Sequence, residues 1–263
     1  MKKSIKHITP ALLAIVAFVA LSFMPADSVT LRLKPQQGKT YTATSKANMM
    51  TMMEVQGQTM NMTQVMETRQ SFTAKEVSDA QSVIESQVEA IKMTISQMGM
   101  KFEYDSEHPE KTNPMLAGQT QELEKSLKKP MTATYDAKGK FIESSDELEM
   151  SQLSNIILEL PEEELSVGST WESQKEQSIS GTEIKVNMEY IVTAISKKGI
   201  DVDFSGTVES TEVSGSYNGS ASINPQTGMV TSSATKSTLS MTVNEQGMSI
   251  PVTVVGSTTV EVK

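Results

Sequence analysis

The chain has 263 residues, a formal net charge of −9 at pH 7 and no cysteine. Without cysteine it has neither disulfides nor the thiol that carries a lipoprotein's lipid, so we expect a non-lipidated protein stabilised by its buried core. The acidic balance, with Arg32 and Arg69 as the two arginines, disfavours nucleic acid and anionic membrane surfaces, because binding a polyanion requires Lys and Arg to displace counterions. No nucleic-acid partner is therefore expected.

The N-terminus predicts export from the cell. Basic residues Lys2, Lys3 and Lys6 precede an uncharged apolar run over 11–21, which is the order found in a secretory signal peptide. This run is shorter than the roughly 20 residues that a membrane-spanning helix needs. We expect residues 1–26 to be a cleaved signal peptide and the mature chain to reside in the periplasm or outside the cell, without stable membrane insertion.

Alternation in the C-terminal half predicts long antiparallel strands. One face of the first strand carries Ile184, Val186, Met188, Tyr190, Val192 and Ala194, and its other face is polar. The turn 196–199 leads into a strand over 200–208, and the pattern returns over 239–243, 248–254 and 258–262. Strands at this spacing, without helices between them, indicate a meander rather than a parallel α/β sheet.

Two mid-chain segments predict helices instead. The first begins at Asn113 and Pro114 and ends at Pro130. The second covers 146–160, has apolar residues at helical spacing and ends at Pro161. We therefore expect a mainly β (α+β) fold: a large curved antiparallel sheet or half-barrel of long hairpins with two short helices inserted mid-chain.

The expected β-rich domain spans 27–263 and contains two halves, 27–145 and 160–263, around a helical segment near 113–160. Gly38-Lys39-Thr40-Tyr41 in the first half matches Gly168-Ser169-Thr170-Trp171 in the second, and the turns 135–141 and 223–229 also correspond. A duplicated β unit would explain these pairs. Their unequal spacing argues against a strict repeat, so duplicated and unrelated halves both stay open.

Short motifs in the second half carry a resemblance. The motifs are Gly168 to Trp171, Tyr217-Asn218-Gly219, Ile223 to Gly228 and Gln246-Gly247. They resemble an uncharacterised family of exported Gram-negative bacterial β-rich proteins classed as a domain of unknown function. The resemblance implies no catalytic residues, because that family has no assigned activity. The expected architecture is also similar to periplasmic lipoprotein carriers of the half-barrel type, a likeness that does not fix function.

Seven methionines crowd around an expected turn at Gln56-Gly57: Met49, Met50, Met52, Met53, Met60, Met62 and Met66. Thioether sulfur is a soft ligand that suits Cu(I) or Ag(I), so a metal-binding hairpin is one hypothesis. The favoured alternative is core packing or a deformable apolar lining. Met60, Met62 and Met66 share a strand face with Phe72, and Met fills irregular apolar space.

Residues 105–110 gather three carboxylates around His108, a combination that could attract a cation. The ligand order of a calcium loop and the Cys or further His of a zinc site are missing, so a solvated loop is favoured. A serine nucleophile would need a base such as His108, and no Gly-x-Ser-x-Gly turn lies near it. We expect no enzymatic activity, no catalytic residues and no cofactor.

Together these patterns favour a non-catalytic exported protein. Its expected ligand is an apolar or amphipathic molecule such as a lipid, or a protein partner in the cell envelope, because aliphatic and Met stripes would line the curved sheet. A Met-rich Cu(I)- or Ag(I)-binding protein and a structural or adhesive surface module are the alternatives.

Overall fold

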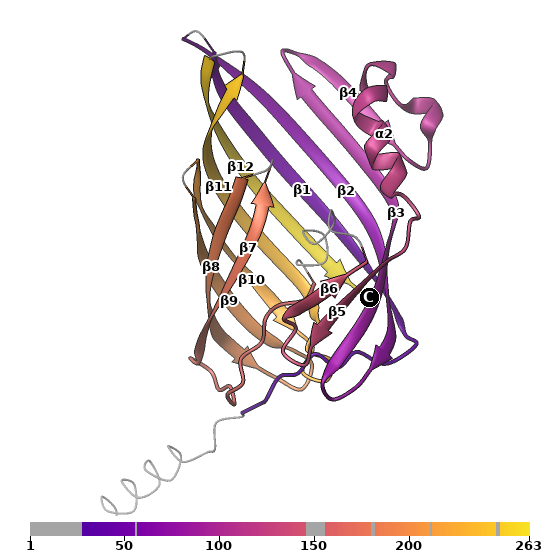
Figure 1. The fold of residues 1–263 in the computed structure, drawn as a ribbon, viewed down its shortest axis with the longest axis vertical. Helices are drawn as coiled ribbons and strands as arrows, with labels where there is room; N and C mark the ends of the chain where they lie inside the picture. Colours follow the sequence, from indigo (N-terminus) through magenta and orange to yellow (C-terminus); the bar gives the residue numbers. More distant parts are fainter. Residues whose placement is uncertain (1–27, 56, 146–155, 180–181, 211, 246–247) are drawn as a thin grey trace, which may run out of the picture.

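A single antiparallel sheet of twelve strands dominates the computed structural model (Figure 1). The structure describes residues 28–263 except 56, 146–155, 180–181, 211 and 246–247. The strands are β1 (Thr40–Val55), β2 (Gln58–Val77), β3 (Gln81–Gln97), β4 (Met100–Asp105), β5 (Met131–Asp136), β6 (Phe141–Ser144), β7 (Thr170–Ile179), β8 (Thr182–Ile195), β9 (Ile200–Glu209), β10 (Val213–Ile223), β11 (Val230–Glu245) and β12 (Met248–Val262). Their order is β6-β5-β3-β2-β1-β12-β11-β10-β9-β8-β7, with β4 beside β3. The predicted mainly β fold with a large curved sheet is confirmed.

The sheet curls into an open half-barrel with two chemically different faces (Figure 1). We call the face that carries Tyr41 and Phe72, which lie opposite each other on β1 and β2, the inner face. All of the buried hydrophobic clusters described for the sheet lie on it. The outer face of the same strands carries Thr44, Lys46 and Glu67, which are solvent-facing or half-buried. Alternation of side chains along each strand produces this separation.

The two halves of the chain join into one sheet at its centre. The first strand, β1, pairs along its length with the last strand, β12, from Ala43 opposite Val262 to Met53 opposite Val252. The second half is a meander on its side of this junction, and the first half departs from one where β3 pairs with both β4 and β5. This junction is compatible with the predicted single β-rich domain made of two halves, each with six strands. Duplication of one β unit stays a prediction.

The predicted hairpin over 184–208 is present as β8 and β9, with one correction at its end. A register shift between Val192 and Ala194 makes Thr193 an extra residue on β8. Ala194 then lies opposite Asp201 and is exposed, whereas Ile195 lies opposite Ile200 and packs against the core. The prediction that Ala194 shares the buried face was wrong because strict alternation does not anticipate a β-bulge.

The first predicted helix is present and packs on the inner face. Short turns over Pro109–Lys111 (η2) and Pro114–Leu116 (η3) lead into α2 (Ala117–Ser126). Leu116, Leu123 and Leu127 pack against β3 and β4 near Tyr104 and Met93. Figure 1 shows α2 beside these two strands.

The second predicted helix, 146–160, lies largely outside the described residues. Its described part, 156–160, is a turn followed by non-helical chain, so the helix prediction is wrong there. Ile156, Ile157 and Leu160 are instead almost fully buried, with 1–2% exposure, because this segment enters the half-barrel. The apolar residues of this segment are spaced as in a helix, but in the structure they pack into the core.

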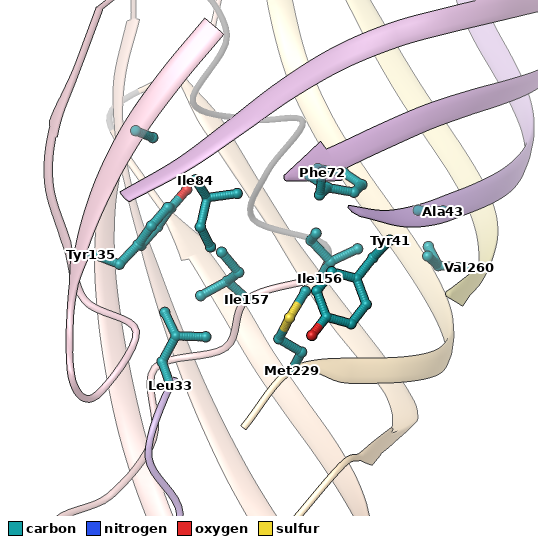
Figure 2. Packing of buried hydrophobic residues seen from close by; sticks show 11 residues of the cluster. Leu33, Tyr41, Ala43, Phe72, Ile84, Tyr135, Ile156, Ile157, Met229 and Val260 are labelled. Carbon is teal, nitrogen blue, oxygen red and sulfur yellow. The ribbon is translucent and has the colours of Figure 1, made fainter. Parts of the chain in front are cut away.

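One end of the half-barrel is closed by two buried segments, 29–33 and 156–165. Leu31 and Leu33 of the first and Ile156 and Ile157 of the second have at most 2% of their surface exposed. Figure 2 shows Leu33, Ile156 and Ile157 gathered with residues of the surrounding strands. We call this region the closed end, and its two segments contribute to the two largest buried hydrophobic clusters described for the protein.

Two hairpin turns hold the buried segments in place through backbone hydrogen bonds. The 135–141 turn accepts the N–H of Leu33 at Ala137 O (2.8 Å) and the N–H of Leu160 at Lys138 O (2.7 Å). On the other side, the N–H of Lys34 donates to Thr227 O (2.9 Å). The same two turns occupy corresponding positions in the sequences of the two halves. In the structure, both turns hold the segments that close one end of the half-barrel.

The open end of the inner face

The opposite end, where the β1–β2, β3–β4 and β11–β12 hairpins have their tips, is lined differently. There the inner-face side chains of β1, β2 and β12 are partly exposed rather than buried. We call this set the open-end wall: Ala47, Met49, Thr51, Met53, Met60, Met62, Gln64, Met66, Val254, Gly256 and Thr258. The wall is apolar with a few hydroxyl and amide groups, which is the chemistry of sites for apolar ligands.

Apolar side chains also stand exposed at the tips of these hairpins. Met98 is 75% exposed and Met100 53% exposed at the β3–β4 turn, and Val243 is 40% and Met248 42% exposed near the β11–β12 turn. Single exposed apolar side chains are ordinary on protein surfaces. Here Met100, Val243 and Met248 extend the inner face toward its rim, while charged Glu54 and Lys101 lie on the outer face beside the turns.

The seven methionines considered as metal ligands lie on both faces of the sheet. Met49, Met53, Met60, Met62 and Met66 belong to the open-end wall, and Met53 lies directly opposite Met60. Met50 and Met52 lie on the outer face, opposite Thr63 and Asn61. The hairpin turn expected at Gln56-Gly57 is present, since Gly57 takes the left-handed φ of 78° between β1 and β2. At most five of the seven can therefore share one ligand site.

Close contacts in β8–β11 cover the glycines on that side of the inner face. Glycines on this face lie opposite large side chains, as with Gly219 opposite Phe204 and Gly206 opposite Met188. A Cβ built on Gly219 would lie 2.6 Å from the Phe204 ring, and one on Gly206 2.2 Å from Met188 Sδ. Large residues thus cover the glycines, a device that shapes curved sheets. Ile184, Val186, Val208 and Val213 are buried in this part.

Two hollows on the outer face have a more polar lining than the open-end wall. Two shallow hollows are lined mainly by outer-face side chains, one over β7–β10 near Asn187 and Glu189, the other over β9–β12 near Asp201 and Glu261. Most of the lining residues have hydroxyl, amide or carboxylate groups, but Met188 and Tyr217 add apolar surface to the hollow over β7–β10. The described residues contain no group of three or more His, Asp or Glu side chains placed to hold a metal. An apolar ligand fits the inner face better.

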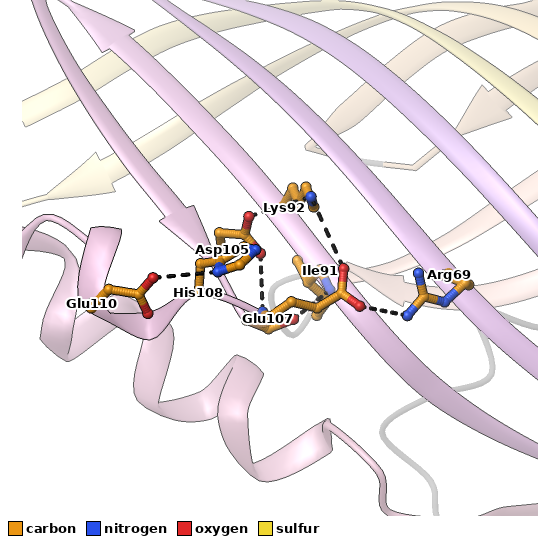
Figure 3. Close-up of polar contacts among 8 residues, drawn as sticks. Arg69, Ile91, Lys92, Asp105, Glu107, His108 and Glu110 are labelled. Atoms are coloured by element: carbon orange, nitrogen blue, oxygen red, sulfur yellow. Dashed lines mark hydrogen bonds and ion pairs between the residues drawn. The ribbon is translucent and has the colours of Figure 1, made fainter.

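The acidic loop 105–110 lies on the outer side of β2–β4, and its carboxylates contact basic side chains (Figure 3). Glu107 accepts from Arg69 at 2.7 Å, Asp105 lies 3.3 Å from Lys92 Nζ, and His108 Nδ1 lies 3.3 Å from Glu110. The Arg69 guanidinium lowers the pKa of Glu107. Burial raises the pKa of Asp105, but the Glu107 N–H and Lys92 outweigh it and the pKa is lowered. The carboxylates are thus paired individually, as expected of a solvated loop.

Sequence reasoning missed a polar position inside the apolar face, on edge strand β7. Trp171, Ser173 and Lys175 alternate along β7 and lie opposite Tyr190, Met188 and Val186 of β8. Alternation from the buried Trp171 would have placed Lys175 on the inner face. Its burial, however, depends on β8 and on the 156–165 segment, which are distant in sequence.

No family model and no curated protein matches the chain. Among solved structures, the chain is similar to lipovitellin, in a structure of its lipid–protein interactions, with a TM-score of 0.50 and 12% identity. The match covers 87% of this chain and 25% of the lipovitellin chain, so this chain spans about a quarter of that protein's length. At this identity the likeness concerns the fold alone.

Two further matches are weaker. One is an outer membrane channel from Pseudomonas putida F1, with a TM-score of 0.29, 7% identity, and 88% and 98% of the two chains covered. The other is the translocator domain of the autotransporter NalP from Neisseria meningitidis, with a TM-score of 0.25, 8% identity, and 94% and 95% covered. None of the helices in the described part of the chain combines the length and apolar character that crossing a bilayer requires. The resemblance to a family of unknown function stays a prediction.

Proposed function

We propose that this protein binds an apolar or amphipathic ligand, such as a lipid, along the open-end wall, without catalysing a reaction. The observation that carries the proposal is the contrast between the two faces of the same strands. On β1, the inner Met49, Thr51 and Met53 are partly exposed, while the outer face of the same strands is largely polar, with Met50 and Met52 among polar neighbours such as Asn48 and Glu54. Apolar surface left accessible beside a well-buried core is characteristic of a binding site.

The lipovitellin-like fold supports the same class of ligand. That protein's structure concerns lipid–protein interactions, and the match extends over most of this chain. Methionine side chains add a physical reason, because unbranched thioethers adapt their shape to different apolar partners. A wall in which Met49, Met53, Met60, Met62 and Met66 predominate would accept hydrocarbon chains without demanding one shape.

The test compares two double variants that change the same residue types on opposite faces. Met49→Gln with Met62→Gln alters the wall, and Met50→Gln with Met52→Gln alters the outer face of the same hairpin. Gln keeps the length of Met while adding an amide that is costly to bury without partners. Affinity for a fluorescent single-chain lipid should fall about tenfold in the inner variant and stay unchanged in the outer one.

Native mass spectrometry of protein taken from its own cells provides the second measurement. Co-purifying lipid supports the proposal, whereas equal lipid affinity of both double variants, or no affinity in the unmodified protein, would reject it. Residence in the periplasm or outside the cell, as the N-terminal pattern predicts, belongs to the same proposal. Cell fractionation with an antibody against the mature chain tests it, and a purely cytoplasmic signal would count against it.

Soft-metal binding is the second candidate, favoured by the five wall methionines that share one face. Met53 and Met60 lie opposite each other, and Met62 follows two residues later on the same face. Sulfur atoms in this arrangement suit Cu(I) or Ag(I). Met53→Leu with Met60→Leu is the appropriate test, because these two methionines lie opposite each other on the inner face, whereas Met52 lies on the outer face and cannot join them. A competition titration with a Cu(I) chelator should lose its binding step in this variant. Titration curves without any such step in the unmodified protein reject the candidate.

A further inference from the structure

One charged side chain interrupts the apolar inner face. Lys175 of β7 lies opposite Val186, and the same rung of the sheet continues through inner-face residues of seven more strands. Those residues are Val208, Gly215, Leu239, Val254, Thr51, Met62 and Gln97. Among the inner-face positions of the strands whose side chains the structure describes, Lys175 alone is a Lys, Arg, Asp or Glu. Its position is therefore an exception to the rule that the rest of the face follows.

The surroundings of Lys175 leave its charge poorly compensated. Burial lowers the pKa of this lysine, and the Glu159 carboxylate, which acts in the opposite direction, does not restore it. Within the described residues no carboxylate comes within ion-pair distance of its ammonium group. A half-buried ammonium without an ion-pair partner is unfavourable, because the water it loses is not replaced by other polar groups.

Next to Lys175 on the same face stands a second unsatisfied polar group. Ser173 is 7% exposed. It lies close enough to the Tyr190 hydroxyl to oppose the effect of burial on the Tyr190 pKa, but its Oγ makes no hydrogen bond of ordinary geometry with a described residue. Buried hydroxyls almost always have a partner, so an unsatisfied one calls for an explanation. Both groups can donate a hydrogen bond, and both belong to β7 beside an apolar surface. A donor pair on the edge strand of a largely apolar inner face matches the head group and tail of an anionic amphiphile.

We propose that Lys175, assisted by Ser173, binds the anionic head group of a single-chain amphiphile whose hydrocarbon chain lies on the inner face. The inference rests on the proposed function and specifies its ligand class. A carboxylate or phosphate oxygen would accept from the ammonium and the hydroxyl at once, and such charge-assisted bonds are strong where water is excluded. The few polar groups of an apolar site set the orientation of its ligand.

The experiment uses three probes with the same chain: dodecanoate, dodecyl phosphate and uncharged dodecanol. Calorimetric affinities are measured for the full mature protein, for Lys175→Met and for the control Lys185→Met. Lys185 is one position away from the Val186 partner of Lys175, but it is exposed on the outer face. Lys175→Met should weaken at least one anionic probe about tenfold or more and change dodecanol less than about twofold. Whichever anion loses more affinity identifies carboxylate or phosphate as the head group.

The conservative variant Lys175→Arg should keep the preference for the anionic probe, which a merely structural role for Lys175 would not predict. Equal binding of all three probes to the protein and to Lys175→Met would overturn the head-group assignment while leaving apolar binding intact. Failure of every probe to bind the unmodified protein would instead overturn the proposed function, and the assignment with it. Loss of anion affinity in Lys185→Met would also reject the assignment, because it would indicate a general charge effect.

Discussion

The closed and open ends of the half-barrel are made from the same long strands, yet their inner faces are completed in different ways. At the closed end, Leu31, Leu33, Ile156 and Ile157 come from outside the strands and bury the sheet's inner face. At the open end, the Met-rich wall of β1 and β2 stays partly exposed. The strands run continuously from one end to the other, so strand alternation alone does not distinguish the stabilising part of the face from the accessible part.

The difference teaches where stability is concentrated. Burial of apolar surface is the main favourable contribution to folding, and it scales with the area removed from water. The closed end also orders Trp171, which stacks on Tyr190 at a centroid distance of 4.8 Å and donates from Nε1 to Glu159 O at 2.9 Å. An end stabilised in this way can leave the other end free to bind, as in sites supported by a rigid scaffold.

The largest effect should come from shortening a residue that fills the closed end. Ile156→Ala removes three carbon atoms from a side chain with 1% exposure, and the expected loss of unfolding free energy is about 2–5 kcal/mol. Met62→Ala in the open-end wall is the matched comparison, and about 1 kcal/mol is expected because Met62 is already partly exposed. Urea unfolding followed by circular dichroism measures both. Equal losses would mean that the two ends are equally packed.

The next effect tests the turns that hold the buried segments. Gly228 has a φ of 68°, and a Cβ added there would lie 2.3 Å from Arg32 O, so Gly228→Ala combines backbone strain with a clash. The expected cost is about 3 kcal/mol, from roughly 1–2 kcal/mol of strain and a similar overpacking contribution. Gly168→Ala has the same strain, with φ 89°, but nothing within 4 Å of the new Cβ. The unfolding free energy of Gly168→Ala should therefore fall only by the cost of the backbone strain. Similar melting temperatures for the two variants would contradict the role of the 223–229 turn.

Sequence reasoning recovered the strands and their faces well, because alternation is a local signal. The face containing Val186, Tyr190 and Val192 is the buried one, and the error began at Thr193, where the bulge depends on pairing with β9. The first helix was recovered from Pro114 and its apolar residues. These features are set by neighbours in the chain.

The closed end could not be predicted in the same way, because its cause is distant in sequence. Ile156 and Ile157 have helical spacing, but this segment is held by distant backbone: the N–H of Leu160 donates to Lys138 O in the 135–141 turn, and Ile156 O accepts from the N–H of Val230, at the start of β11. Likewise, the sequence places Lys175 on the Trp171 face by alternation, but its burial follows from β8 and Glu159. The methionine group was found, yet its division between the faces required the β1–β2 register.

A smaller effect of opposite sign is expected at Lys175. Its pKa is lowered from the ordinary value of 10.5, so the unfolded chain binds its proton more readily and the charged lysine opposes folding at neutral pH. In ligand-free protein, Lys175→Met should therefore raise the unfolding free energy by about 1 kcal/mol. The gain should shrink as the pH rises toward 10.5, where the wild-type lysine loses its charge. A variant less stable than the wild type would show that Lys175 supports the fold rather than a ligand.

The smallest effect concerns the outer face, which should contribute little at either end. Arg69 lowers the pKa of Glu107 below its ordinary value of 4.5, so this pair stabilises the protein above that pH and loses its contribution as the pH falls through the lowered pKa. Arg69→Met should leave the melting temperature at pH 7 nearly unchanged, because the pair is exposed to solvent, and should flatten its fall between about pH 5 and pH 3. Lys46→Met, which removes the exposed pair with Glu67, is the control for a general loss of positive charge. A large loss at pH 7 in Arg69→Met alone would mean that the β2–β4 side of the outer face, and not only the closed end, determines stability.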